Sequence, residues 1–185
     1  MPDCVAIIPV RGNSKGILGK NLVDFGGKPL FMWTVEAAIE SGVFEWVVVS
    51  TEDKKIKEIV RSYQNGAVGI VDRPEYLSQD HVQLSEVVLH TYRHMECEWA
   101  LHPTTLCLLQ ATSPLRTGAH IVNAMRQYKG RGTLFSAYID KRYHWSVGDR
   151  VEPIQHNPER RLGRQWEPSQ IYTENGAIYI FPAKR

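Results

Sequence analysis

Cysteine and long apolar stretches are scarce in this sequence. Of its 185 residues three are cysteines, Cys4, Cys97 and Cys107, and no pair has the CxxC spacing of a redox or zinc site. Cys4 and Cys107 lie in apolar runs, so we interpret them as small buried side chains in a reducing compartment. The sequence shows no signal-peptide pattern and no apolar run near the ~20 residues that cross a membrane. We therefore expect a cytoplasmic protein with no membrane partner.

A large charge of either sign is missing too. The formal net charge is +2 at pH 7 and 43% of the residues are hydrophobic, whereas nucleic-acid-binding domains are usually strongly basic. The stretch NPERRLGRQW is cationic and holds a tryptophan, which leaves a basic RNA-binding module as one alternative. The near-neutral balance argues against it, and we expect no nucleic-acid partner. The length fits a single domain over residues 1–185.

Short apolar runs alternate with longer amphipathic ones. The runs predicted as strands are 4–10, 46–50, 67–71, 105–110 and 175–181, and the predicted helices are 29–42, 53–63, 85–97 and 118–130. Continuous apolar strands separated by helices predict an α/β fold, a three-layer Rossmann-like sandwich with a mainly parallel sheet. The right-handed crossover rule places the carboxyl ends of the parallel strands on one edge, where such folds bind ligands.

The first predicted strand runs into IIPVRGNSKGILGKN, a glycine-containing loop with Arg11, Lys15 and Lys20. It is not a Walker A loop, because Ser14 replaces the first glycine and Asn21 the final hydroxyl residue. It is not a Rossmann fingerprint either, because the next predicted helix begins too late. Three cations and free backbone N–H groups beyond a strand end suit a triphosphate, whose leaving pyrophosphate they would stabilise.

A second polar stretch, LLQATSPLRTG, follows the strand predicted at 105–110. The side chain of Gln110 offers a donor and an acceptor at the ligand edge of the sheet. Thr112 and Ser113 are predicted to cap the following helix, with Pro114 beside them. We find no Ser/His/Asp or Cys/His arrangement that would supply a nucleophile.

These stretches, together with VSTED, DRPEYLSQD and NGAIYI, resemble in order and spacing the acylneuraminate cytidylyltransferases, the CMP-sialic acid synthetase family. Related enzymes for legionaminic and pseudaminic acid share the motifs. The resemblance spans nearly the whole chain and implies a sheet of the nucleotide-diphospho-sugar transferase type. It also implies a reaction in which CTP and a nonulosonic acid give a CMP-sugar and pyrophosphate. Such a transfer needs positioning and charge stabilisation rather than an enzyme nucleophile.

The resemblance assigns roles residue by residue. The catalytic residues are Arg11 and Lys20. The nucleotide-binding set is Pro9, Val10, Arg11, Gly12, Asn13, Ser14, Lys15, Lys20, Asn21 and Arg73. The sugar-binding set is Gln110, Thr112, Ser113, Arg116, Arg164 and Asn175. Within these sets the resemblance implies that Arg73 lies along the cytosine, and we expect Arg164 to bind the sugar's carboxylate.

From about residue 138 the sequence loses any clear period and carries three prolines and several cations. Disorder is one interpretation, but Tyr143, Trp145 and Trp166 make the segment too aromatic for a typical solvated linker. The resemblance implies that residues 138–172 form a dimerisation arm that packs on a second subunit. Lys141 and Arg142, at the start of that arm, are the reserve candidates for the sugar's carboxylate.

Two features depart from the family pattern. Leu84 stands where the family usually has a serine near the base, with Ser85 one step away, so the pattern predicts phosphate binding more firmly than cytosine selection. The family's later D-x-D pair, which helps to hold magnesium, is missing; Asp53 and Asp80 are isolated, as a helix-start residue and a loop cap. We expect magnesium as cofactor with unknown protein ligands. Either the chain is a fragment or nucleotide phosphates hold most of the ion.

Two alternatives to this function stay open on the sequence. The first is another sugar-nucleotide pyrophosphorylase of the same architecture. The second is a nucleotide-binding protein without catalysis, which the missing metal pair favours.

Overall fold

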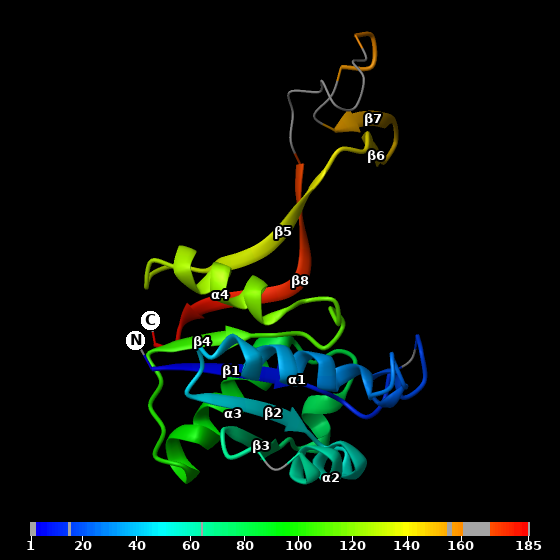
Figure 1. Ribbon diagram of the computed structural model, residues 1–185. Coiled ribbons are helices and arrows are strands. Elements are labelled where there is room, and N and C mark those ends of the chain that lie inside the picture. The colour runs from blue at the N-terminus through cyan, green and yellow to red at the C-terminus, as the bar shows by residue number, and fades with distance from the viewer. Residues whose placement is uncertain (1–2, 15, 64, 155–156, 161–170, 185) are drawn as a thin grey trace. The chain divides into compact units, whose positions relative to one another are not determined.

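The computed structural model describes residues 3–14, 16–63, 65–154, 157–160 and 171–184 (Figure 1). Within them a six-stranded sheet has the order β3-β2-β1-β4-β8-β5. Its strands are β1 (Cys4–Pro9), β2 (Trp46–Thr51), β3 (Val68–Asp72), β4 (Thr105–Leu108), β5 (Leu134–Asp140) and β8 (Ile171–Pro182). Strands β1 to β4 are parallel to one another, and β8 runs antiparallel to β4. The predicted α/β class and mainly parallel sheet are confirmed.

Helices cover both faces of this sheet. They are α1 (Leu30–Ser41), α2 (Lys54–Ser62), α3 (Leu84–Glu98) and α4 (Gly118–Gln127), with short 3-10 turns η1 (Lys20–Leu22) and η2 (Glu75–Ser78). Buried residues of α1, α2 and α4 share one hydrophobic cluster with the sheet, and those of α3 belong to the other. Figure 1 shows α1 in front of the strands and α3 behind them. The four predicted helices and the three layers are therefore present.

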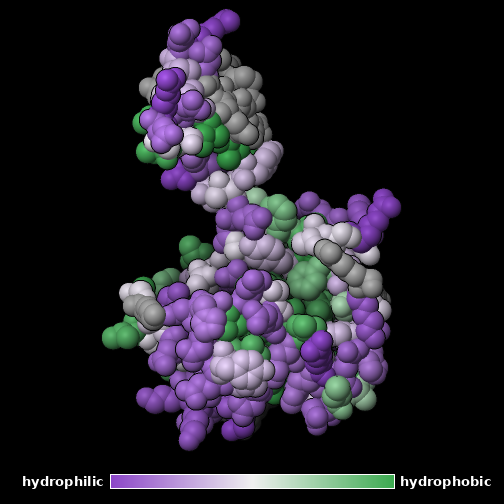
Figure 2. All heavy atoms as spheres, turned by 180° about the vertical axis from the view of Figure 1, so that it is seen from behind, coloured by the Kyte–Doolittle hydropathy of each residue, from purple (hydrophilic) through white to green (hydrophobic). Residues whose placement is uncertain are grey.

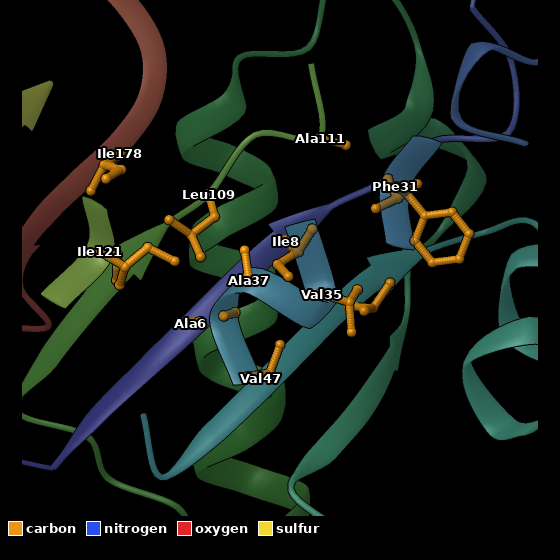
Figure 3. Close-up of a cluster of buried hydrophobic side chains, with 14 of the residues drawn as sticks. Ala6, Ile8, Phe31, Val35, Ala37, Val47, Leu109, Ala111, Ile121 and Ile178 are labelled. Atoms are coloured by element: carbon orange, nitrogen blue, oxygen red, sulfur yellow. The ribbon is translucent and has the colours of Figure 1, made fainter. Parts of the chain in front are cut away.

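Strand β1 lies at the centre of the core, with side chains in both hydrophobic clusters. This position explains why its sequence is apolar without a break. Ala6 and Ile8 face α1, where Figure 3 shows them near Val35 and Ala37, whereas Ile7 belongs to the opposite cluster with α3. Because both faces are buried, every position of the strand needs an apolar side chain. Full burial of a Val or Ile side chain contributes about 1.5–3 kcal/mol.

The buried cysteines agree with the sequence interpretation. Cys4 and Cys107 are 1% and 0% exposed, and all three cysteines are free thiols. Burial raises the pKa of the Cys4 thiol to about 12, so it stays neutral and packs as an apolar side chain.

Of the predicted helix caps, Asp53 is confirmed, whereas Thr112 and Ser113 are wrong. Asp53 is the N-cap of α2, and its side chain accepts a hydrogen bond from the Ile56 backbone. Thr112 and Ser113 do not cap α4, because that helix begins at Gly118 with Thr117 as its N-cap. A Cβ at Gly118 would lie 3.0 Å from the backbone nitrogen of Ser41 in α1. The helix therefore starts with glycine where the two backbones approach closely.

The chain divides into two compact units, of which the second is Ala137–Asn175. In it β6 (His144–Val147) pairs antiparallel with β7 (Val151–Ile154). The sequence analysis missed both strands and β5. These strands are partly or largely exposed, so they lack the apolar runs that marked the central strands. No helix in the described part of the chain is long and apolar enough to cross a membrane.

Candidate functional site

A cleft of about 300 Å³ lies where the parallel strands end. Pro9 is the last residue of β1 and Arg11 follows it, Arg73 follows β3, and Gln110 follows β4. The lining residues are Pro9, Arg11, Ser14, Lys20, Asn21, Arg73, Leu77, Ser78, Gln79, Asp80, Val82, Leu84, Val87, Gln110, Ala111 and Thr112. The structure thus brings eight of the predicted site residues to one cavity, which is the edge the strand topology indicated.

The loop after β1 is held by its own hydrogen bonds. The hydroxyl of Ser14 donates to the Ile17 carbonyl (2.5 Å) and accepts from the Lys20 backbone (3.0 Å). The buried side chain of Asn21 donates to the Arg11 carbonyl at 2.8 Å. These bonds restrain the backbone next to Arg11 and Lys20, the two cationic residues that this loop contributes to the cleft lining. Lys15 lies outside the described residues.

Arg11 forms an ion pair across the cleft. Its Nη1 lies 2.7 Å from Oδ1 of Asp80, and the two side chains are 37% and 43% exposed. Exposed pairs of this kind contribute little, typically about 0–1 kcal/mol. A triphosphate can therefore replace Asp80 as the partner of Arg11 at small cost.

Arg73 is buried and paired with a carboxylate that the sequence analysis did not identify. Its Nη2 and Nε donate to Oε2 of Glu52 at 2.7 and 3.3 Å. The other oxygen of Glu52 accepts from the Gly12 backbone at 2.7 Å. Burial alone would raise the pKa of the Glu52 carboxyl, but the bonds from Arg73 and Gly12 outweigh it and the pKa lies below its ordinary value. Its position directly after a buried strand was the signal that could have identified it.

The predicted sugar-side residues do not all reach the cleft. Gln110 and Thr112 line it, whereas Arg116 is buried and its Nη1 donates to the carbonyls of Gln110 (3.1 Å) and Ala177 (2.6 Å). Burial lowers the pKa of Arg116 to about 10, so the guanidinium remains charged at neutral pH. Asn175 belongs to the second unit.

The remaining predicted residues that the structure describes do not line the cleft. Ser113 is part of the turn after Gln110, where its carbonyl accepts from the Arg116 backbone. Val10 is fully buried, and its amide donates to the Ser50 carbonyl at 2.9 Å. Gly12 and Asn13 belong to the loop beside the cleft, and Arg164 lies outside the described residues. Sequence reasoning also missed Asp80, which it treated only as a loop cap.

The described residues do not form a protein cage for magnesium. No group of three His, Cys, Asp or Glu side chains among them can hold a metal ion. Asp53 is occupied as the α2 cap, and Asp80, which lines the cleft, pairs with Arg11. A single cleft carboxylate fits the way Mg²⁺ binds with phosphates, but not an all-protein site.

The sequence comparison decides the family. The model of the family described as "Cytidylyltransferase" matches residues 5–180. The chain belongs to this cytidylyltransferase family. It is 28% identical over 187 residues to the pseudaminic acid cytidylyltransferase of Campylobacter jejuni serotype O:2, covering 97% of this chain and 78% of that protein.

Two N-acylneuraminate cytidylyltransferases are also similar to this cytidylyltransferase. The Escherichia coli O18:K1:H7 protein is 38% identical over 128 residues, covering 68% of this chain and 28% of its own length. A Danio rerio protein is 30% identical over 182 residues, with 95% of this chain and 40% of its own covered. The chain therefore spans less than half the length of each of these two relatives.

Solved structures confirm the fold of this family member. A CMP:2-keto-3-deoxy-manno-octonic acid synthetase complexed with CTP matches with a TM-score of 0.67 at 18% identity, covering 98% of this chain and 74% of that one. The 4-diphosphocytidyl-2C-methyl-D-erythritol synthase of Anaerococcus prevotii matches with a TM-score of 0.68 at 13% identity, covering 99% and 71%.

Proposed function

We propose that this cytidylyltransferase activates a nonulosonic acid with CTP, giving a CMP-sugar and pyrophosphate. The observation that carries the proposal is the cleft at the strand ends, where Arg11, Lys20 and Arg73 converge in a chain of this family. The relatives that cover most of the chain are named for pseudaminic and N-acylneuraminic acid. The sugar's anomeric oxygen would bond to the α-phosphorus while the bond to the leaving pyrophosphate breaks, and the hydroxyl proton would pass to solvent.

The residue roles follow from the positions in the cleft. Arg11 and Lys20, with Lys15 beside them in sequence, bind the triphosphate. Arg73 and the strand end at Pro9 and Val10 contact the base; because the Val10 amide is bonded to Ser50, its carbonyl is the group we propose for this contact. Magnesium would accompany CTP and be held mainly by phosphate oxygens.

Binding of the sugar's carboxylate is assigned to an arginine, because a planar guanidinium pairs with a carboxylate through two parallel bonds. Arg164 remains our first choice. Of the two reserve residues, Arg142 is already paired with Asp140, with its Nε 2.9 Å from Oδ1. Lys141 is exposed and is therefore the better reserve.

A substrate panel tests the proposed function. Pyrophosphate release is measured with CTP, UTP, ATP and GTP against pseudaminic, legionaminic and N-acetylneuraminic acid and the methyl ester of each. We expect CTP to exceed ATP and GTP clearly, and the esters to be poor acceptors. Equal rates with all nucleotides would instead indicate another pyrophosphorylase of this fold. CTP binding without release from any sugar would indicate a non-catalytic nucleotide-binding protein.

We also propose that the 138–172 segment mediates a homodimer. In the hairpin β6–β7, Val147 is 80% and Val151 63% exposed, and Trp145 and Ile154 are 41% exposed. Figure 2 shows hydrophobic residues gathered on this unit beside hydrophilic ones. Exposed apolar patches of this kind are typical of interfaces. Light scattering should give twice the chain mass at micromolar concentration, and Val147→Asp should shift it toward the monomer; a monomeric wild type would refute the proposal.

A further inference from the structure

Glu52 connects two segments that approach the cleft from different parts of the chain. One segment is the loop after β1, whose Gly12 amide donates to Oε1; the other begins with Arg73, which donates to Oε2. The side chain of Glu52 is 21% exposed and that of Arg73 is 4% exposed. The bonds are charge-assisted and lie near their best lengths, so they restrain both segments strongly.

The pairing changes what Arg73 can contribute. With its charge balanced by Glu52, Arg73 adds little net positive potential for a triphosphate, and Arg11 and Lys20 remain the cations for that purpose. Nη1 of Arg73 forms no hydrogen bond within the described part of the chain. Because Arg73 lines the cleft, this end of the guanidinium can donate to a neutral ligand group rich in acceptors, such as a pyrimidine ring.

A close approach of the backbone at Gly12 supports the same geometry. A Cβ placed on Gly12 would lie 2.3 Å from Oδ2 of Asp53, the residue after Glu52. The absence of a side chain at residue 12 therefore lets the loop pack against the end of β2, where Glu52 accepts its amide. This contact does not depend on Arg73.

We propose that Glu52 is a positioning residue of the nucleotide site. Its carboxylate binds both the Arg73 guanidinium and the Gly12 amide at the start of the loop after β1. The groups that contact the base and the groups that contact the phosphates are thereby held at a fixed distance from each other. An amide at this position has one acceptor oxygen and would turn an NH₂ group toward a second donor. This inference rests on the proposed function, because it assumes that CTP is the ligand of the cleft.

Calorimetric binding of CTP and UTP to wild type and Glu52→Gln tests the proposal. We expect the Kd for CTP to rise by about 10–100-fold, as for a lost charge-assisted contact, and the preference for CTP over UTP to fall. The matched control is Glu58→Gln, which alters an exposed carboxylate of α2 and should bind as wild type does. An unchanged Kd and preference in Glu52→Gln would overturn the proposal.

A double-mutant cycle separates positioning from general loss of structure. If Glu52 acts partly through Arg73, the loss of CTP affinity in Glu52→Gln/Arg73→Met should be smaller than the sum of the two single losses, and the loss beyond that of Arg73→Met alone should report the loop contact at Gly12. Additive losses would overturn this role. Should Glu52→Gln fail to fold by circular dichroism, Glu52→Asp serves in its place, with weakened binding expected and wild-type binding contradictory. These experiments measure CTP binding and do not depend on turnover. A wild type that binds CTP but releases no pyrophosphate would refute the proposed function, whereas the role of Glu52 in binding could still be tested.

Discussion

Replacement of Lys20 by alanine should lower kcat with CTP by about 100-fold or more. The lysine lines the cleft, and its backbone amide is fixed by the Ser14 hydroxyl, so its ammonium group starts from a fixed point of the backbone beside the place where the phosphates would lie. Charge grows on the leaving pyrophosphate during the reaction, and a fixed cation stabilises that charge more than it stabilises bound CTP. The effect should therefore appear in kcat and not only in KM.

Steady-state kinetics of pyrophosphate release checks this prediction. Lys54→Ala is a matched control, because Lys54 is an exposed lysine at the start of α2, and its kinetics should match those of wild type. Lys20→Arg should retain part of the activity, since it keeps the charge and changes its shape. Unchanged turnover in Lys20→Ala would remove the lysine from the catalytic assignment.

Replacement of Arg116 by alanine should reduce the free energy of unfolding by about 3 kcal/mol. The guanidinium joins the turn after β4 to β8 through the carbonyls of Gln110 and Ala177. Hydrogen bonds from a charged donor contribute about 1.5–3 kcal/mol, and truncation of a buried side chain also leaves a cavity. Urea unfolding measures the change as a lower midpoint with an unchanged slope.

Two further variants sharpen this test. Arg116→Met should cost less than alanine, because it fills the space and removes a buried cation whose Nε and Nη2 have no partner among the described residues. Arg126→Ala, an exposed arginine of α4, should leave the midpoint unchanged. If Arg116→Ala unfolds at the same urea concentration as wild type, the two carbonyl contacts do not hold the sheet together.

The central sheet could be predicted because strands that are buried on both faces consist almost entirely of apolar residues, which the sequence shows directly. The run 4–10 is apolar throughout, and the run 46–50 is apolar up to Ser50. The glycine at residue 42 adopts a φ of 62° that ends α1. Strand β5 could not be predicted in the same way. It is an edge strand of the sheet, next to β8, and it is only partly buried. Its position depends on pairing with β8, a segment that is far from it in the sequence.

The candidate site was predictable to the extent that it follows strand ends. Arg11, Lys20, Arg73 and Gln110 come together because they follow β1, β3 and β4, which belong to one parallel part of the sheet and end at the same edge. Arg116 shows the limit of this reasoning: its motif indicated the sugar side, but its partner Ala177 is 61 residues away. Only the folded structure shows that the Arg116 guanidinium donates to backbone carbonyls and does not line the cleft.

The hydroxyl of Ser14 has a thermodynamic consequence for ligand binding. Its two hydrogen bonds, to Ile17 and from Lys20, and the bond from the Leu22 amide to the Gly19 carbonyl hold this turn together through contacts within the chain. Fixing a backbone residue costs about 1–2 kcal/mol of conformational entropy. For these residues that entropy is lost when the chain folds, not when the nucleotide arrives. Affinity for a phosphate chain at this turn therefore carries a small ordering penalty, as in other preorganised sites.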